Sequence, residues 1–334
     1  MQVVEAAEDA TDMVAEVTRA GEDLDAARAA VSEVIFGQDR VIEEALVTVL
    51  AGGHGLLVGV PGLAKTRLVE SLATVLGLDD KRIQFTPDLM PGDILGSEVL
   101  DEGEDGRRSF RFIRGPVFCQ LLMADEINRA SPRTQAALLQ AMQEHHVTVA
   151  GERHDLPRPF HVLATQNPLE QEGTYPLPEA QLDRFLMQID VRYPDLDAER
   201  RMLLATTGAE TATLKSVLEA GRLRDYQDLV RRIPVGEAVM DGILTLVRNA
   251  RPGQSTLEDI SDYVAWGPGP RGSQALMLAV RARALIQGRF APSLDDVEAL
   301  ALPILQHRMA LTFAARAEGR TIAEVIDTLI NTIR

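Results

Sequence analysis

Gly59-Val-Pro-Gly-Leu-Ala-Lys-Thr66 is the stretch of this sequence that decides the fold. An apolar run at 55–58 precedes it and a helical pattern at 68–73 follows it, so the local order is strand, tight loop and helix. In that order a glycine-containing loop turns backbone N–H groups toward one point, and the positive end of the helix attracts an anion there. The stretch therefore predicts a phosphate-binding loop, in which Lys65 reaches the β- and γ-phosphates and the Thr66 hydroxyl holds Mg²⁺.

The loop departs from the common pattern at one position, because Ala64 stands where a glycine usually precedes the lysine. Alanine is disfavoured at positive φ, so we expect Ala64 to have a negative, helix-like φ. Taken alone, the stretch also fits an ordinary Gly-Pro turn before a helix.

Composition describes a globular protein of 334 residues that is 46% hydrophobic, 25% charged and only 4% aromatic. The formal net charge is −16, and residues 1–50 carry twelve acids against three bases. Binding to nucleic-acid phosphates needs a clustered basic surface, so this balance argues against a passive nucleic-acid coat. It does not exclude a small basic ring on an assembled particle.

The single cysteine, Cys119, excludes an internal disulfide and the usual cysteine-based zinc sites. The acidic N-terminal stretch lacks the basic start and apolar run of a signal peptide. No segment has the eighteen or so apolar residues that a membrane span requires. We therefore expect a cytoplasmic protein with no transmembrane segment.

Apolar strand candidates alternate with helices or loops in the first two thirds of the chain, at 55–59, 82–85, 119–124, 161–166 and 186–191. This alternation predicts a parallel sheet covered by helices on both faces. After Pro194 the strand signals stop, and helical patterns follow at 197–208, 236–250, 271–288, 294–309 and 321–333. We therefore divide the chain into an N-terminal helical extension (1–34), an α/β core (35–194) and an all-helical C-terminal domain (195–334).

Four local features refine this division. The N-terminal extension has an apolar stripe at helical spacing, made by Val14, Val17, Leu24, Ala27 and Val31. Glycines and prolines punctuate 86–118, which predicts an insertion with a small hairpin and an acidic tip at Asp101–Asp105. A second hairpin is predicted at 145–160, and Thr321 with Glu324 predicts a capping box at the last helix.

Polar residues follow two of the predicted strands. Asp125 and Glu126 end an apolar strand, where they face the ligand crevice of a parallel sheet, and buried carboxylates there are costly without a role. Asp125 can order Mg²⁺, and Glu126 can take a proton from an attacking water. Asn167, after the next strand, can orient that water or contact the γ-phosphate. The alternatives are an acidic helix cap at 125–126 and a turn before Pro168.

Together with Leu182-Asp-Arg-Phe185, these motifs resemble an AAA+ ATPase, that is, a P-loop NTPase core with a helical lid domain. The phrases Gly59–Thr66, Asp125-Glu-Ile-Asn-Arg-Ala130 and Gln181-Leu-Asp-Arg-Phe185 are similar to the MoxR branch in particular, in which alanine at position 64 is usual. The resemblance covers residues 32–334.

The resemblance implies a role for each motif. Gly59–Thr66 is similar to Walker A, and 121–126 is similar to Walker B with Glu126 as the general base. Asn167 resembles sensor 1, and Arg184 resembles an arginine finger that reaches a neighbouring subunit's γ-phosphate. Arg271 resembles sensor 2, acting on its own or on the neighbouring site. The implied ATP-binding residues are Phe36, Gly37, Gln38, Gly59, Val60, Pro61, Gly62, Leu63, Ala64, Lys65, Thr66 and Arg67.

The segment 86–118 resembles the family's helix-2 insert, and 145–160 resembles its pre-sensor hairpin. The resemblance implies a Mg²⁺-dependent ATPase in a ring, expected to be a hexamer, that remodels or activates client proteins. Partners with von Willebrand factor A domains, in metal or cofactor insertion, are also implied by the resemblance alone.

Three alternatives stay open. A nucleic-acid motor is disfavoured by the acidic balance and by a second hairpin whose only arginines are Arg153 and Arg158. A metal-chelatase motor subunit has the same core motifs. A nucleotide-gated scaffold that hardly hydrolyses ATP fits poorly with the intact set of Lys65, Glu126 and Arg184.

Overall fold

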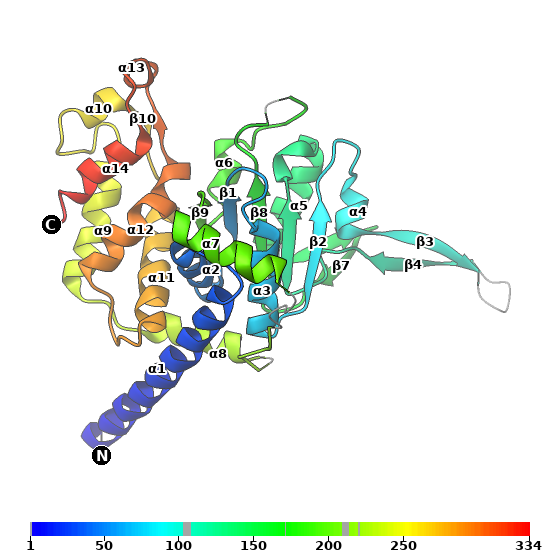
Figure 1. Ribbon diagram of the computed structural model, residues 1–334, viewed down its shortest axis with the longest axis horizontal. Helices are drawn as coiled ribbons and strands as arrows, with labels where there is room; N and C mark the ends of the chain where they lie inside the picture. Colours follow the sequence, from blue (N-terminus) through cyan, green and yellow to red (C-terminus); the bar gives the residue numbers. More distant parts are fainter. Residues whose placement is uncertain (1, 103–107, 171, 209–213, 220) are drawn as a thin grey trace.

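A computed structural model gives the fold of the chain (Figure 1). The structure describes residues 2–102, 108–170, 172–208, 214–219 and 221–334, and in residues 2–11 it describes only the helical backbone. Within the described residues, none of the helices combines the length and the apolar character that crossing a bilayer needs.

A sheet of five parallel strands forms the centre of the molecule, in the order β2-β5-β8-β1-β9. All five predicted strands are confirmed; they are β1 (Gly55–Val58), β2 (Asp80–Gln84), β5 (Leu121–Asp125), β8 (His161–Gln166) and β9 (Met187–Asp190). Because the strands are parallel, the carboxyl ends of β1, β5 and β8 meet at one edge of the sheet. That edge brings the phosphate-loop stretch and the acidic pair together.

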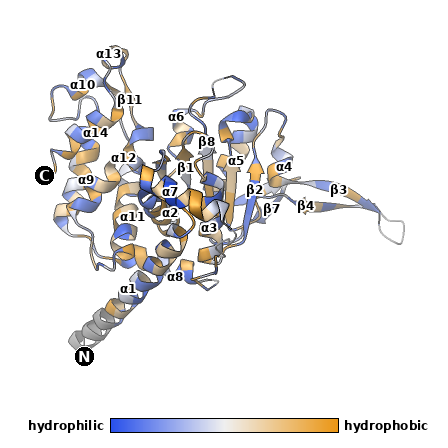
Figure 2. Cartoon of the chain, in the orientation of Figure 1, coloured by the Kyte–Doolittle hydropathy of each residue, from blue (hydrophilic) through white to orange (hydrophobic). Residues whose placement is uncertain are grey.

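Side chains alternate between the two faces of the sheet, and each face has its own hydrophobic cluster. Leu57, Leu121 and Met123 belong to a cluster that includes helices α2 and α3, whereas Leu56 and Leu122 belong to a cluster that includes helix α5. Figure 2 shows apolar colour on the central strands of the sheet, whereas the edge strand β2 is mostly hydrophilic. The helices are α2 (Asp39–Leu50), α3 (Lys65–Leu76) and α5 (Pro132–Glu144). The predicted doubly covered sheet is confirmed.

Two hairpins project from the core. The first consists of β3 (Gly96–Glu102) and β4 (Arg108–Arg114) after the short helix α4 (Pro91–Leu95), and it extends far from the body (Figure 1). The second consists of β6 (His146–Val149) and β7 (Glu152–Asp155). Both predicted hairpins are confirmed; part of the expected acidic tip, residues 103–105, lies outside the described residues.

The C-terminal region is mainly helical. Its elements are α7 (Leu196–Thr207), α8 (Arg222–Arg232), α9 (Glu237–Asn249), α10 (Ile260–Tyr263), α11 (Pro270–Ile286), α12 (Leu294–Leu305), the 3-10 turn η2 (Gln306–Arg308), α13 (Phe313–Ala317) and α14 (Ile322–Ile330). The capping box at Thr321 and Glu324 is confirmed. The fold class is confirmed, and one detail differs: β10 (Val264–Trp266) and β11 (Ala310–Leu311) form a small antiparallel sheet, so this region is not entirely helical. These strands are too short to leave a periodic signal.

Helix α1 (Gln2–Ser32) packs against α2, α3, α8 and α11. Val17, Leu24, Ala27 and Val31 are buried as predicted, but the inclusion of Val14 in the stripe is wrong, because its side chain is 47% exposed. The first half of α1 extends beyond the body of the protein (Figure 1), so no partner surface covers Val14 there. The cluster that buries α1 also contains Leu276 of α11 and Leu57 of β1. The proposed division at 194/195 is therefore crossed by one continuous core.

Candidate active site

The phosphate-loop stretch joins β1 to α3 as predicted. The Lys65 side chain folds back over the loop, and its Nζ donates to the carbonyl oxygens of Gly59 (2.6 Å) and Val60 (2.8 Å). Partial burial lowers the pKa of Lys65, while the nearby carboxylates of Asp125 and Glu126 oppose that shift. The Lys65 ammonium group is thus held at the mouth of the loop. An anion bound there would compensate for the hydration that the ammonium group loses on burial.

The expectation of a negative φ at Ala64 is wrong. Ala64 has φ +57° and ψ +23° and sits directly before the first residue of α3, and Gly62 has φ +85°. The loop needs these left-handed residues to turn its N–H groups inward before the helix starts. An alanine in this conformation costs roughly 1–2 kcal/mol, and such strain is typical of functional loops.

Asp125 is held in a fixed orientation at the end of β5. Its Oδ1 accepts a hydrogen bond from Thr165 Oγ1 (2.6 Å), and its Oδ2 accepts one from Arg82 Nη2 (2.6 Å). Thr165 Oγ1 also accepts from the backbone N–H of Glu126 (2.8 Å), so β5 and β8 are locked together at this edge. Asp125 itself is only 9% exposed.

Glu126 faces the same edge from a left-handed backbone conformation, with φ +55°. Its Oε2 accepts hydrogen bonds from Gln84 Nε2 (2.7 Å) and from Arg129 Nη1 (3.0 Å). The Arg129 side chain is 40% exposed, so it reaches Glu126 from the surface side of this edge. The candidate base, Glu126, is therefore held by two donors: Gln84 from the neighbouring strand β2, and Arg129 from the turn that follows Glu126.

Asn167 lies just beyond β8 and is 5% exposed. Its Oδ1 accepts from the backbone N–H of Leu169 (3.1 Å), which is the turn-forming contact considered as the alternative role. It also lines the cavity of the phosphate loop, so its side-chain amide nitrogen can still face a ligand. Both interpretations of Asn167 are compatible with its position.

A cavity of about 450 Å³ collects these residues; it is lined by 61–67 together with Asp125, Glu126, Thr165 and Asn167. The loop offers a lysine, a hydroxyl and inward N–H groups, and the end of β5 adds two carboxylates. This set suits a triphosphate with its magnesium ion, because Mg²⁺ prefers oxygen ligands, phosphate oxygens included. Thr66 and Asp125 are the residues that would hold the ion.

A second cavity of about 270 Å³ adjoins the loop. It shares Pro61–Ala64 and Arg67 with the loop, and Phe36 and Gln38 line it as predicted. Gly37 is not among the lining residues; it packs against Pro194 and Ala198 instead. Sequence reasoning missed the opposite wall, formed by Tyr193, Pro194, Glu199, Met202 and Thr206. The lining of this cavity is mostly apolar, and its volume is large enough for a nucleobase.

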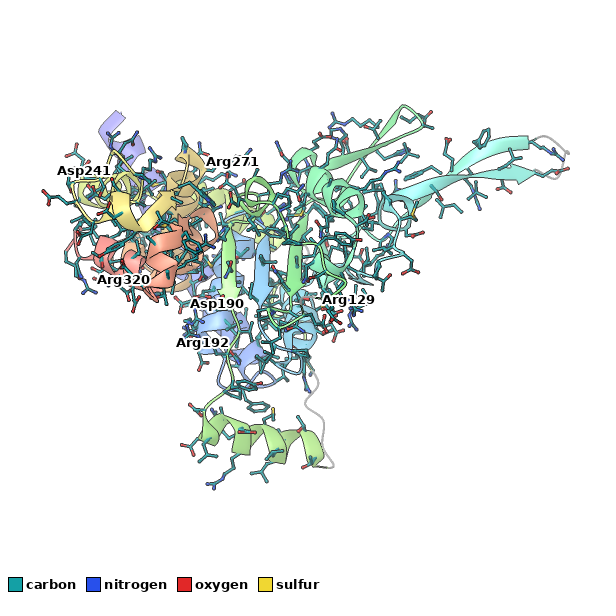
Figure 3. All side chains as sticks on the ribbon, turned by 90° about the horizontal axis from the view of Figure 1, so that it is seen from above. Arg129, Asp190, Arg192, Asp241, Arg271 and Arg320 are labelled. Atoms are coloured by element: carbon teal, nitrogen blue, oxygen red, sulfur yellow. The ribbon has the colours of Figure 1, made fainter. Side chains whose placement is uncertain are left out.

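The two predicted arginines lie elsewhere. Arg184 and Arg271 line a third cavity, of about 440 Å³, together with His54 and His145, and neither lines the two cavities at the phosphate loop. Arg129 contacts Glu126, and Figure 3 shows Arg129 and Arg271 in separate parts of the molecule. Within one chain, the structure therefore separates the arginines from the residues that would hold ATP.

Comparisons with known proteins identify the family of the chain. The model of the ATPase family associated with various cellular activities (AAA) matches residues 54–187, and the AAA lid domain model matches residues 257–329. The chain is 42% identical over 304 residues to Chaperone MoxR1 of Mycobacterium tuberculosis (strain ATCC 25618 / H37Rv). The aligned region covers 91% of this chain and 80% of that protein. The chain belongs to the MoxR family of AAA+ ATPases.

Other relatives support the same MoxR assignment. Protein MoxR of Paracoccus denitrificans is 33% identical over 327 residues, covering 92% of this chain and 94% of that protein. A crystal structure of a candidate ATPase from Cytophaga hutchinsonii superposes with a TM-score of 0.88 at 35% identity, covering 98% of both chains. In this MoxR-family chain, Arg184 falls within the AAA match and Arg271 within the lid match.

The contacts that sequence reasoning missed come from neighbouring strands. Arg82 and Gln84 lie on β2, and they reach Asp125 and Glu126 because β2 pairs with β5. The sequence contains no signal for the order of strands, so it could not predict that these two residues contact the candidate site.

Proposed function

We propose that this chain is a Mg²⁺-dependent ATP hydrolase that works as a ring of identical subunits and remodels or activates client proteins. The observation that carries the proposal is the separation just described: Lys65, Asp125 and Glu126 meet at one cavity, whereas Arg184 and Arg271 meet at another. A hydrolysis site that uses both groups needs two copies of the chain.

In the proposed reaction, water attacks the γ-phosphate in line with the leaving ADP oxygen. Lys65 and the loop N–H groups orient the β- and γ-phosphates, and Glu126 accepts the proton of the attacking water. When bound by Thr66 and Asp125, Mg²⁺ would neutralise charge on the phosphates. Asn167 orients the water through its side-chain amide.

Arg184 of a second subunit would complete the site. Its side chain is only half-buried, and among the described residues no hydrogen bond or ion pair ties down its guanidinium. The transition state spreads negative charge over the phosphoryl oxygens, and an arginine supplied in trans is worth on the order of a thousandfold or more in rate. We extend the same assignment to Arg271, because it lines the cavity of Arg184 and not the nucleotide cavities.

Exposed apolar side chains on the β3–β4 hairpin support a protein client. Leu100 is 51% exposed and is paired across the hairpin with Phe110, which is 70% exposed. On the second hairpin, by contrast, Arg153 is already paired with Asp155 (2.8 Å). Projecting apolar side chains suit a polypeptide better than a phosphate backbone, which needs free cations. Clients with von Willebrand factor A domains belong to this proposal through the family alone.

The test is the ATPase rate per subunit over a wide range of protein concentration, with Mg²⁺ present and with Mg²⁺ chelated. The proposal expects the rate per subunit to rise steeply as rings assemble and to vanish on chelation. A dilute monomer that hydrolyses ATP as fast per subunit as the concentrated protein would overturn the requirement for a second copy.

A further inference from the structure

A short turn of the lid contacts the arginine-bearing segment of the core. This turn is η2, and its three consecutive side chains all reach the segment 183–188. Gln306 Nε2 donates to the Gln188 carbonyl (3.1 Å), and His307 Nε2 lies 3.1 Å from the Phe185 carbonyl. Because a carbonyl only accepts, that ring nitrogen carries the proton, and burial holds the pKa of His307 well below its usual range. The third side chain, Arg308, makes the closest contacts.

Arg308 is 3% exposed, which is rare for an arginine. Its Nε donates to Asp183 Oδ1 (2.8 Å), its Nη2 to the Phe185 carbonyl (2.6 Å) and its Nη1 to the Leu186 carbonyl (3.0 Å). The guanidinium also donates to the carbonyls of Ile304 and Asp183. A guanidinium has five N–H donors in a rigid fork, so every side of this one faces an acceptor.

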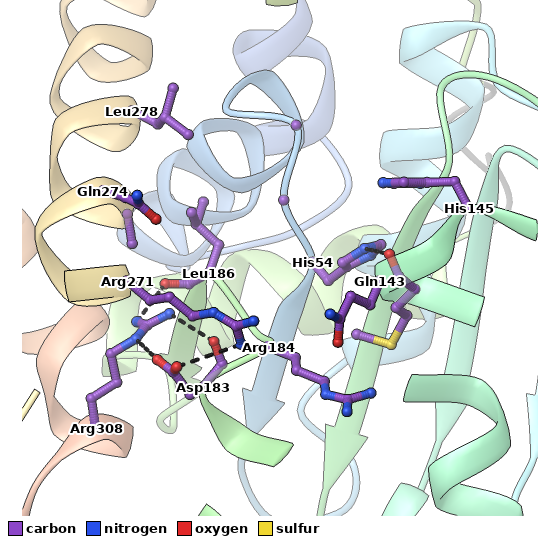
Figure 4. A pocket seen from close by; sticks show the side chains of 14 residues that line it. His54, Gln143, His145, Asp183, Arg184, Leu186, Arg271, Gln274, Leu278 and Arg308 are labelled. Carbon is purple, nitrogen blue, oxygen red and sulfur yellow. Dashed lines mark hydrogen bonds and ion pairs between the residues drawn. The ribbon is translucent and has the colours of Figure 1, made fainter. Parts of the chain in front are cut away.

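Arg184 lies in the middle of the segment that Arg308 grips, between Asp183 and Phe185. Asp183 also links Arg308 to the second candidate arginine, because its Oδ2 lies 3.7 Å from Arg271 Nη1. Figure 4 shows Arg308, Asp183 and Arg271 joined in one cluster, while Arg184 extends away from it into the cavity. The backbone of Arg184 is therefore fixed on both sides while its guanidinium stays available.

Burying a charged guanidinium is costly unless its partners are placed well, and removing one partner of such a group is strongly destabilising. The Arg308 guanidinium is satisfied by the backbone carbonyls of Asp183, Phe185 and Leu186, so it also fixes the backbone of that segment. We infer that Arg308 is a positioning residue: it holds the segment 183–186 so that Arg184, and with it Arg271, points out of this subunit toward the ATP of the next one. The inference rests on the proposed function, since it assumes that Arg184 acts in trans.

A second lid arginine offers a matched control. Arg283 of α11 also ties the lid to the core, because its Nε donates to Glu43 of α2 (2.8 Å) while its Nη1 donates to Asp296 (2.6 Å). It is largely buried, with 20% of its side chain exposed, and within the described part of the chain its side-chain hydrogen bonds and ion pairs involve only Glu43 and Asp296. Replacing Arg283 weakens the attachment of the lid without disturbing the segment that carries Arg184.

The experiment compares Arg308→Lys with Arg283→Lys in the full-length chain, after circular dichroism has shown that both fold. Lysine keeps the charge but cannot span the fork of acceptors. We expect Arg308→Lys to lower kcat by about a hundredfold, the cost of misplacing a catalytic group by about 1 Å, with the KM for ATP unchanged. Arg283→Lys keeps the wild-type kcat.

The deciding readout is rescue in trans. Glu126→Gln subunits have an inactive site but an intact Arg184, so an excess of them mixed with Arg308→Lys subunits should restore hydrolysis. A residue that merely supports its own subunit's site would not be rescued in this way. If Arg308→Lys does not fold, Asp183→Asn removes the same ion pair with little change of shape and is expected to give the same rescue.

Two negative outcomes are distinguishable. If Arg184→Ala is rescued by Glu126→Gln subunits but Arg308→Lys is not, the positioning role is overturned and the proposed function stands. If Arg184→Ala hydrolyses ATP at the wild-type rate on its own, the proposed function fails, and the role of Arg308 fails with it.

Discussion

The nucleotide edge, formed by Gly59–Thr66, Asp125 and Glu126, and the arginine edge, formed by Arg184, Arg271 and Arg308, are built in different ways. At the nucleotide edge the functional groups follow the ends of adjacent parallel strands, and contacts between neighbouring strands, such as the one between Thr165 and Asp125, fix them. At the arginine edge the functional groups come from the core and from the lid, and contacts across more than a hundred residues fix them. Residues of the first edge line one cavity of the chain, whereas Arg184, Arg271 and Arg308 line another.

Under the proposed function, the two edges of one chain would serve two different active sites, its own and that of the neighbouring subunit. A substitution at the nucleotide edge should damage the subunit that carries it. A substitution at the arginine edge should damage only the neighbour.

The largest expected effect is at the nucleotide edge. Glu126→Gln removes the proton acceptor and keeps the shape of the side chain, so we expect kcat to fall about a thousandfold or more while ATP still binds. Steady-state ATPase assays and calorimetric titration with ATP measure the two quantities. Gln84→Ala, which removes a donor to Glu126 and an acceptor from Arg82 but keeps the carboxylate, is the control for a general disturbance of this edge. Normal turnover in Glu126→Gln would show that another group accepts the proton.

The next largest effect is expected at the arginine edge. Arg184→Ala should lower kcat on the order of a thousandfold in the assembled protein, with little change in ATP affinity, because the affected site belongs to the next subunit. The matched control is Arg320→Ala in the lid, whose guanidinium lies 4.9 Å from the ring centroid of Tyr263. A loss of ATP binding in Arg184→Ala would place this arginine in its own subunit's site.

A buried carboxyl group away from both edges separates effects on folding from effects on chemistry. Glu44 of α2 is 4% exposed; one oxygen accepts from Arg40 (2.7 Å), and its Oε2 has no hydrogen-bond partner in the described part of the chain. Burial raises the pKa of Glu44 to about 7, against an ordinary value of 4.5. Because the folded pKa is the higher one, protonated Glu44 stabilises the fold at low pH, and this contribution is lost as pH rises through 7.

As pH rises from about 5 to about 8.5, the wild type should therefore lose about 2–3 kcal/mol of unfolding free energy relative to Glu44→Gln. Urea unfolding of both proteins at the two pH values measures this difference. The ATPase rate of Glu44→Gln per folded subunit should not change. A difference in stability that stays constant with pH would mean that Glu44 is ionised throughout this range.

The smallest effect concerns the left-handed residue of the phosphate loop. Ala64→Gly relieves roughly 1–2 kcal/mol of backbone strain but adds freedom to the unfolded chain, so we expect a net gain in stability of up to about 1 kcal/mol. The same substitution at Ala136, exposed in the middle of α5, should instead cost about 1 kcal/mol. Urea unfolding of both variants tests the sign, and a loss of stability at position 64 would contradict the strained geometry.

The sequence predicted the nucleotide edge better than the arginine edge, for a physical reason. Strand, loop and helix follow one another from Gly55 to Leu76, so local periodicity was enough to place Lys65 and Thr66, and an apolar run was enough to place Asp125. The conformation of Ala64 was missed because the chemistry of the loop overrides the preference of alanine.

Other parts of the site depend on tertiary order, which a single sequence does not reveal. Gln84 reaches Glu126 only because β2 lies beside β5, and Arg308 is buried only because η2 docks onto the segment 183–188. Arg308 resembles any other lid arginine in sequence, since neither its neighbours nor its spacing sets it apart. The roles of Arg184 and Arg271 came from resemblance and stay predictions.

Mixing two inactive variants tests the central claim most directly. Glu126→Gln subunits lack a working nucleotide edge, and Arg184→Ala subunits lack a working arginine edge. We predict that each is nearly inactive alone and that an equal mixture regains about a quarter of the wild-type rate, since half of the sites keep Glu126 and half of those face an intact Arg184. A mixture no more active than the sum of its parts would contradict a site shared between two chains.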